Sequence, residues 1–180
     1  SLFIVKLGKL RREIIRQKLE LLPEILEEYM PNKVVVFTIH KEPARKLQSL
    51  YPKNSILINS DIPAKETQGY IDRFQQDSNI NFAFVTIDTC NEGLDFSAAN
   101  HVIHAELDWT PDKHKQASGR ILNTEKATPT TANFLVANNT VDEDIAEVLV
   151  TKSKAIEEVI GGNLFSKILN GLFFSNVTKI

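Results

Sequence analysis

The chain has 180 residues, of which 42% are hydrophobic and 24% charged, which indicates one globular domain with a sizeable core and excludes a disordered chain. No run of about 18 apolar residues occurs, so we expect no membrane span. The net charge of −2 argues against a large basic surface for nucleic acid, but it is compatible with a localised basic groove.

The sequence has one cysteine, Cys90, so no internal disulfide can form. Free thiols are typical of reducing compartments, and the first residues lack the pattern of a signal peptide. We therefore expect a cytoplasmic or nuclear protein that is not secreted. Because Cys90 has no evident histidine partner, we expect a small buried residue there. The first residue is Ser1 rather than methionine, which suggests an excised fragment.

Five short apolar runs are predicted to be strands. They are Val34–Ile39, Ile56–Ile58, Phe82–Ile87, Val102–Leu107 and Ala132–Ala137. Several are continuously apolar and β-branched rather than alternating. This pattern is typical of parallel strands that are covered on both faces.

Helical patterns lie between most of these runs. A lead-in or linker helix, residues 1–17, is predicted to precede a second helix that starts near Lys18, with Pro23 in its first turn. Further helices are predicted over Glu42–Leu50, over Ala64–Gln75, from Thr110-Pro111-Asp112 onward, and over Val141–Ile160. Residues 18–162 thus form the predicted domain, and residues 163–180 form an apolar tail.

The alternation of strands and helices predicts an α/β fold with a mostly parallel sheet flanked by helices. Ligands of such sheets bind beyond the carboxyl ends of the strands. The polar or aromatic residues at those ends are Thr38, His40, Lys41, Asn59, Ser60, Asp61, Asp88, Thr89, Asp108 and Trp109. We expect these residues to mark the working edge of the sheet.

Three features with chemical meaning lie between Phe84 and Asn123. The first is a glycine-containing loop, in which Gly93 permits close backbone approach and Asp95 can accept hydrogen bonds from ribose hydroxyls. The second is the corner at Trp109. The third is Gln116-Ala117-Ser118-Gly119-Arg120, whose end residues share a helical face; an arginine there can bind phosphate oxygens.

This segment resembles motifs V and VI of superfamily-two helicases and translocases, particularly the Swi/Snf-related ATPases. Gly93-Leu94 is similar to motif V, Trp109-Thr110-Pro111 to the corner that follows the next strand, and Gln116–Arg120 to the start of motif VI. Lys33–Lys41 is similar to motif IV, and the resemblance extends in order from Lys18 to Ile160. It implies the C-terminal, second RecA-like lobe of such a motor.

The resemblance implies roles for individual residues. Arg120 and Gln116 would sense the phosphates of ATP, and Gly93 and Asp95 would help to hold the nucleotide. The residues that would contact nucleic acid are Thr38, His40, Lys41, Thr86 and Trp109. The implied partners are DNA, expected to be double-stranded, and an N-terminal RecA-like lobe, which would bind most of the ATP and Mg²⁺. No metal site is expected here, because His101 and His104 point to opposite faces of a strand.

The sequence also departs from the family pattern. It contains no phosphate loop and no acidic magnesium motif, so by itself the lobe should not hydrolyse ATP. Asn123 stands where motif VI has its second arginine, a role that Arg120 or Lys126 could take over.

Several alternatives stay open, for the whole chain and for particular residues. The lobe could be a degenerate binding module without turnover, or part of a strand-separating DNA or RNA helicase. An unrelated flavodoxin-like domain is disfavoured, because no glycine-rich loop follows the first strand. Trp109 could be a core or domain-interface anchor, and the basic stretch from Arg11 to Lys18 is expected to be a solvated helix face.

Overall fold

We analysed a computed structural model of the chain, which describes residues 2–121, 130–160 and 176–180. Within these ranges, six strands form one sheet in the order β2-β3-β1-β4-β5-β6, and every pairing is parallel. The strands are β1 (Val34–Thr38), β2 (Ser55–Ile58), β3 (Phe82–Thr86), β4 (His101–His104), β5 (Thr131–Val136) and β6 (Asn176–Lys179). The predicted α/β class with a parallel sheet is confirmed.

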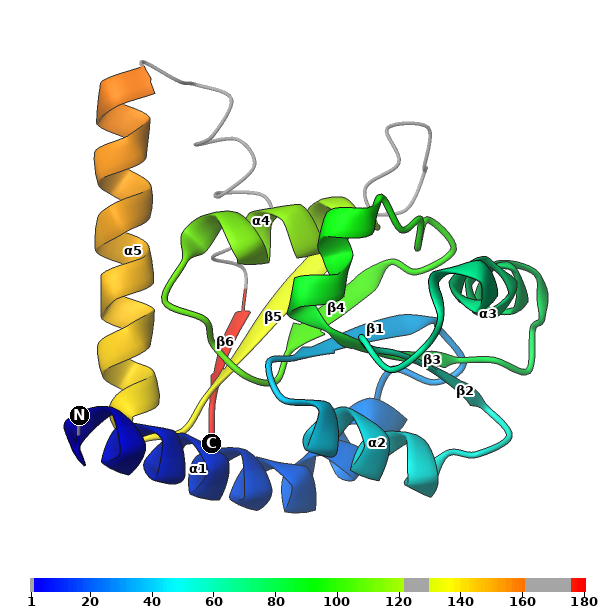
Figure 1. Ribbon diagram of the computed structural model, residues 1–180, viewed down its shortest axis with the longest axis horizontal. Coiled ribbons are helices and arrows are strands. Elements are labelled where there is room, and N and C mark those ends of the chain that lie inside the picture. The colour runs from blue at the N-terminus through cyan, green and yellow to red at the C-terminus, as the bar shows by residue number, and fades with distance from the viewer. Residues whose placement is uncertain (1, 122–129, 161–175) are drawn as a thin grey trace.

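Helices cover both faces of this sheet. They are α1 (Leu2–Glu27), α2 (Lys41–Leu50), α3 (Ala64–Gln76), α4 (Pro111–Gly119) and α5 (Val141–Ile160), with a short 3₁₀ helix, η1 (Ile87–Glu92), after β3. Figure 1 shows α1 and α2 below the sheet and α3 and α4 above it. No helix in the described ranges is both long enough and apolar enough to cross a membrane.

The apolar runs are continuous because each strand contributes to two cores. Val34 and Val36 in β1 pack into the cluster under α1 and α2, whereas Val35 and Phe37 pack into the cluster with α3 and α4. Successive strand residues point to opposite faces, so in a strand covered on both sides every side chain faces one of the two cores, and an apolar run results. All five residues of β1 are buried.

The first helix differs from its prediction. The expected lead-in helix and the helix expected from Lys18 form one continuous helix, Leu2–Glu27, and Pro23 lies inside it. An interior proline removes one helix hydrogen bond, at a cost of about 3 kcal/mol. Leu22 and Leu26 are fully buried against the sheet on either side of Pro23, and this burial holds the helix across it.

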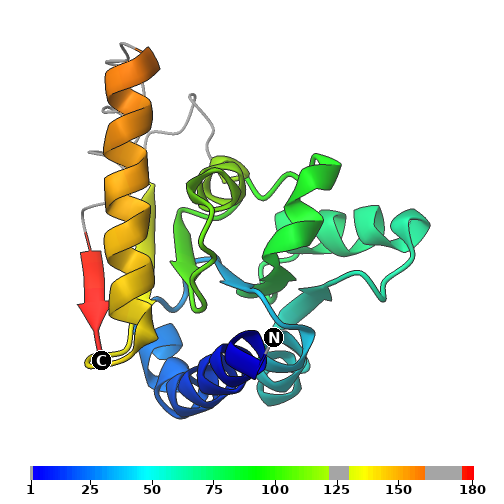
Figure 2. The same ribbon diagram turned by 60° about the vertical axis from the view of Figure 1, so that its left-hand side comes forward.

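The carboxyl ends of the strands differ from the predicted ends by a few residues. Ile39 and Ile87 lie just beyond β1 and β3, and the apolar run after β4 leaves the strand at Ala105. The strand β6 was not predicted; it pairs with β5 through the register Asn133↔Asn176 and lies at one edge of the sheet (Figure 2).

Candidate functional site

Arg120 ends α4 and joins it to the loop after β3. Its Nη2 donates a hydrogen bond to the carbonyl oxygen of Cys90 at 2.6 Å, and its own carbonyl accepts one from the backbone N–H of Phe96 at 2.9 Å. Its Nε is buried and has no hydrogen-bond partner among the described residues. The guanidinium is thus fixed at one nitrogen and keeps unused donor capacity at another.

The loop that Arg120 contacts is shaped by Gly93. This glycine has a φ of 73° and ends η1 in the left-handed region, which non-glycine residues rarely adopt. The side chain of Asp95 is exposed, and its Oδ1 accepts the backbone N–H of Ser97 at 2.8 Å. The fold therefore needs Gly93 for its backbone conformation, and it keeps Asp95 at the surface.

A glutamine from α3 holds the same loop in place. Gln75 accepts the backbone N–H of Ala98 at 2.7 Å and donates to the carbonyl of Asp95 at 3.2 Å and to the hydroxyl of Ser97 at 3.1 Å. This role could not be predicted from the sequence, because glutamine is common on exposed helix faces. Gln75 is a positioning residue for the loop that Arg120 contacts.

The helix α4 begins where its sequence predicts, with Thr110 as the N-cap and Pro111 as the first residue, although the Thr110 hydroxyl makes no capping hydrogen bond. Gln116 is exposed one turn before Arg120. Trp109 is half-buried and packs against the core that α3 and α4 cover, and its carbonyl accepts a hydrogen bond from Lys152 at 3.0 Å.

Two buried histidines attach α4 to the sheet. The backbone N–H of Asp108 donates to His114 Nε2 at 2.9 Å, so the ring proton of His114 lies on Nδ1 and is donated to His104 Nδ1 at 3.0 Å. The Nε2 of His104 then donates to the Ser118 hydroxyl at 2.9 Å. This series of hydrogen bonds requires both imidazole rings to be neutral.

The electrostatics agree with that assignment. Burial lowers the pKa of His114 to about 4, and burial together with the neighbouring His114 lowers the pKa of His104 well below its ordinary value. Burial also raises the pKa of the Cys90 thiol to about 12, although Arg120 acts in the opposite direction. Cys90 is 1% exposed, so the prediction of a small buried residue is confirmed.

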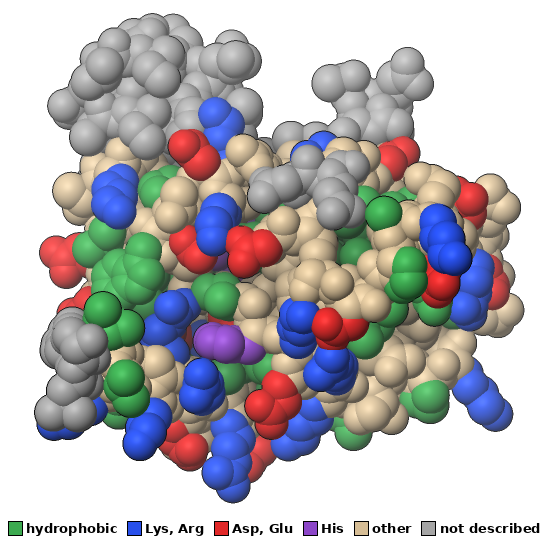
Figure 3. Space-filling model, in the orientation of Figure 1, with side chains coloured by type: hydrophobic (Ala, Val, Ile, Leu, Met, Phe, Trp, Pro, Cys, Tyr) green, Lys and Arg blue, Asp and Glu red, His purple; other side chains and the backbone are tan. Residues whose placement is uncertain are grey.

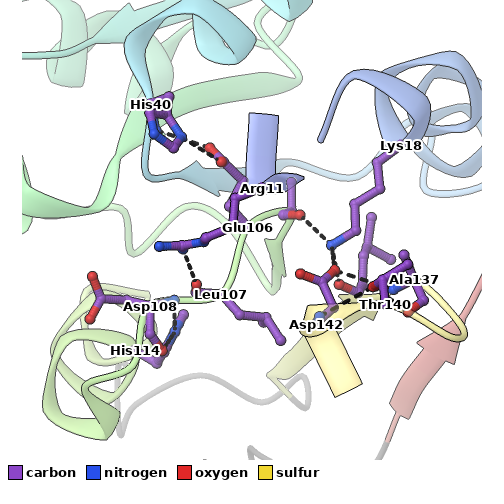
Figure 4. A network of polar contacts seen from close by, with 12 residues as sticks. Arg11, Lys18, His40, Glu106, Leu107, Asp108, His114, Ala137, Thr140 and Asp142 are labelled. Atoms are coloured by element: carbon purple, nitrogen blue, oxygen red, sulfur yellow. Dashed lines mark hydrogen bonds and ion pairs between the residues drawn. The ribbon is translucent and has the colours of Figure 1, made fainter. Parts of the chain in front are cut away.

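At the carboxyl end of β1, the predicted contact groups are already engaged within the chain. The Thr38 hydroxyl donates to the carbonyl of His40 at 2.8 Å. The carboxylate of Glu106 accepts the backbone N–H groups of Ile39 and His40 at 2.8 and 2.9 Å, and it meets His40 Nδ1 at 2.7 Å (Figure 4). Glu106 therefore occupies the backbone donors that precede α2.

The other predicted contacts at this edge are also partnered. Lys41 and Arg45 both form ion pairs with Asp61, which follows β2, and the hydrogen bond from Lys41 contributes most to lowering the pKa of Asp61. Thr86 is buried at the end of β3, and its carbonyl accepts the Thr89 hydroxyl at 2.6 Å. Asp61 thus neutralises much of the positive charge at this end of the sheet.

The expected solvated face on α1 is only partly present. Lys18 is 2% exposed, donates to the carbonyls of Ala105 at 2.9 Å and Leu135 at 2.6 Å, and forms an ion pair with the buried Asp142 (Figure 4). Burial lowers the pKa of Lys18, and Asp142 opposes that effect. Arg11 also turns inward and donates to the carbonyl of Leu107 at 2.5 Å.

Sequence reasoning missed both Glu106 and Lys18 as organising residues, although each left a trace. Glu106 is the one acidic residue in the apolar run Val102–Leu107, and Lys18 interrupts the apolar face of α1. A charge inside an apolar pattern indicates a buried, partnered group. Asn123 and Lys126 lie outside the described residues.

No group of three or more histidine, cysteine or acidic side chains in the described part of the chain could hold a metal ion. Among the described residues, the side chains of Arg120 and Lys113 contact the segment after β3, and Lys113 is paired there with Asp88. An arginine with a free donor, on a helix next to a glycine loop at the carboxyl edge, suits the binding of an anionic ligand.

Comparison with known proteins identifies the family. The model for the helicase conserved C-terminal domain matches residues 17–124. The mouse DNA annealing helicase and endonuclease ZRANB3 is 31% identical over 107 residues, which cover 59% of this chain and 10% of the relative. The Caenorhabditis elegans homologue of the SWI/SNF-related matrix-associated actin-dependent regulator of chromatin subfamily A-like protein 1 is 27% identical over 143 residues, covering 75% of this chain and 21% of the relative.

The fold agrees with these matches. The crystal structure of the C-terminal part of the Fun30 ATPase domain superposes with a TM-score of 0.67 over 73% of this chain and 44% of that one, at 18% identity. The chain thus spans between a tenth and about a fifth of the length of these curated relatives. It belongs to the helicase conserved C-terminal domain family, as the second RecA-like lobe of a superfamily-two protein related to the SWI/SNF helicases.

Proposed function

We propose that this lobe forms half of the ATP site of a motor that translocates along double-stranded DNA. The observation that carries the proposal is the state of Arg120, which is anchored to the β3 loop through one nitrogen while its buried Nε has no partner among the described residues. A buried cationic donor without a partner is costly unless a ligand completes it. A nucleotide phosphate in the cleft between two lobes would complete this one.

In this mechanism ATP is the substrate, and an N-terminal lobe supplies the phosphate loop and the magnesium ligands. Arg120 offsets the charge that develops on the transferred phosphoryl group, and Gln116 on the same helical face orients it. Gly93 and Asp95 contact the nucleotide from the loop after β3. Arg120 connects α4 to that loop through hydrogen bonds. Binding of a phosphate to Arg120 would therefore hold α4 and the loop more firmly together, and release of the phosphate would loosen them.

Nucleic acid would lie along the carboxyl edge of the sheet. His40, Lys41 and Trp109 are the proposed contacts to its backbone, which carry no sequence information. Thr38 and Thr86, which were expected to join them, are buried, so their role would be to shape this edge. The name of the mouse relative, a DNA annealing helicase, supports DNA as the partner. A motor of this kind would work in the nucleus or the cytoplasm.

A second candidate is a lobe that binds without turnover. Asn123 favours it, because the family has an arginine at this position and such a finger is worth on the order of 10³–10⁵ in rate. A third is strand separation, which a strand-displacement assay of the full-length protein distinguishes from translocation.

The test is DNA-stimulated ATP hydrolysis by the full-length protein and its Arg120→Gln variant. The control is Arg73→Gln, which removes an exposed arginine from α3. We expect a loss of at least about tenfold for Arg120→Gln and none for the control. Equal rates in the two variants would contradict the proposal, and so would strong hydrolysis by residues 1–180 alone.

Asn123→Arg separates the first two candidates. If the wild-type protein has no measurable hydrolysis and the added arginine restores it, the non-hydrolysing module is correct. A normal wild-type rate that the substitution leaves unchanged would exclude that module.

A further inference from the structure

The basic stretch on α1 divides into two groups that face different ways. Arg11 and Lys18 turn inward and bind backbone carbonyls, as described above. Lys9, Arg12 and Arg16 face outward, at spacings of three and four residues, so they lie on one side of the helix. Helix geometry places Lys9 and Arg16 about 10 Å apart along the axis.

These three side chains line a groove between α1 and α2. Its volume is about 340 Å³, and its other basic lining residues are His40, at the start of α2, and Lys46, within α2. Figure 3 shows lysine and arginine side chains gathered around an exposed histidine on the face that carries α1 and α2. His40 gives one ring nitrogen to Glu106, so Nε2 is the ring atom left for a ligand.

The charges in this groove are poorly neutralised. Four lysine and arginine side chains line it against two acidic ones, Glu13 and Glu42. The only ion pair recorded among them within the described residues joins Arg16 to Glu13 at 3.6 Å, and both partners are largely exposed. Such a pair contributes little and does not cancel the local positive potential.

By contrast, cations at the neighbouring carboxyl edge of the sheet are neutralised by ion pairs. Lys41 and Arg45 are paired with Asp61, and Lys113 is paired with Asp88 and Asp108. Affinity for a phosphate backbone comes from unneutralised cations that displace condensed counterions. By this criterion the groove is a better site for a phosphate backbone than the edge beside it.

We propose that the groove between α1 and α2 binds the phosphodiester backbone of duplex DNA as a second contact, continuous with the edge of the sheet through His40. This goes beyond the proposed function, because Lys9, Arg12 and Arg16 precede residue 17, where the match to the helicase domain begins. The contact lies on α1, and it extends the proposed DNA-binding surface along that helix.

The test is the salt dependence of binding to a fluorescent DNA duplex, measured by anisotropy with the full chain. The groove variant is Arg12→Gln with Lys46→Gln, and the matched control is Arg73→Gln with Lys53→Gln. Each pair removes one arginine and one lysine, and all four side chains are exposed. The edge variant is Lys41→Gln.

We expect the groove variant to bind less tightly and its slope of log affinity against log salt to fall by roughly two, whereas the control keeps the wild-type slope. Equal slopes in the groove variant and the control overturn the inference. A loss in the edge variant alone overturns the groove. A loss in the groove variant alone supports it and leaves the proposed function to the ATPase test, because Lys41 is already paired with Asp61. Absence of duplex binding by the wild-type chain would contradict both the groove and the proposed function. If polyglutamate binds as tightly as the duplex, the assignment to DNA is wrong.

Discussion

Two buried or half-buried cations near the carboxyl edge of the sheet, Lys18 and Arg120, differ in how many of their hydrogen-bond donors have partners. The ammonium group of Lys18, beneath β4 and β5, has two carbonyls and the carboxylate of Asp142 as partners for its three donors. The guanidinium of Arg120, beside the β3 loop, has one carbonyl partner and a buried Nε with none among the described residues. Both groups join distant segments, but only Lys18 is saturated.

This difference distinguishes a structural cation from the one that we propose binds a phosphate. Removing Lys18 should strongly destabilise the lobe, because the buried carboxylate of Asp142 would lose its cation and keep only the hydrogen bond from the backbone N–H of Ala137 among the described residues. Removing Arg120 should leave the fold nearly intact and abolish a function that depends on a phosphate. Each of the following experiments tests one side of the comparison.

The largest effect is expected for Lys18→Met. Breaking a buried ion pair by removing one partner costs about 3–5 kcal/mol, because Asp142 is left buried without its cation. Urea unfolding measures the loss. Combining Lys18→Met with Asp142→Leu should recover much of it, and a loss below about 1 kcal/mol for the single variant would show that the pair does not hold α1.

Acid should weaken the attachment of α4 through His114. Its folded pKa of about 4 lies below the ordinary value, so the unfolded chain binds the proton more readily and stability rises with pH. The contribution, roughly 3 kcal/mol at most, is present above pH 6.5 and is lost as pH falls from there toward 4.

His114→Gln removes this titration. Urea unfolding between pH 7 and pH 4 should show a smaller acid loss for the variant than for the wild-type chain. Equal pH profiles would mean that folding does not lower the pKa of His114, and the buried, neutral hydrogen-bonded arrangement through His104 would then be wrong.

Arg120→Lys keeps the charge and removes the planar fork. We expect the free energy of unfolding to change by no more than about 1 kcal/mol, and the DNA-stimulated ATPase rate of the full-length protein to fall by at least about tenfold. A large loss of stability with an unchanged ATPase rate would show that Arg120, like Lys18, has a structural role.

The smallest effect is expected for Asp61→Asn. This change frees Lys41 and Arg45 from an exposed carboxylate, so duplex DNA should bind up to about fivefold more tightly at low salt. The gain should shrink as salt is added. Weaker binding in anisotropy titrations would mean that these two cations do not face the DNA.

Much of the fold could be predicted from the sequence, because a strand buried on both faces has a continuous apolar run and the helices between the strands are amphipathic. The exceptions have physical causes. The continuity of α1 was missed because Pro23 indicated the first turn of a new helix, whereas burial of Leu22 and Leu26 outweighs the lost hydrogen bond. The strand β6 gains its stability from pairing with β5, which no local pattern reveals.

The candidate site divides in the same way. Arg120 and Gly93 could be identified because their spacing is local. The partners of Lys18 could not, since its hydrogen-bond acceptors lie 87 and 117 residues away along the chain. Glu106 likewise meets His40 across 66 residues.

The position of β6 has a consequence for how the chain behaves in a crowded solution. Without β6, the backbone donors and acceptors along the outer side of β5 would be open, and β5 is an apolar strand with five of its six residues buried. An open apolar edge of this kind recruits strands from other molecules and promotes aggregation. Chains cut before Asn176 should therefore precipitate more readily during expression and refolding, even where every residue of the proposed nucleotide and DNA sites is retained.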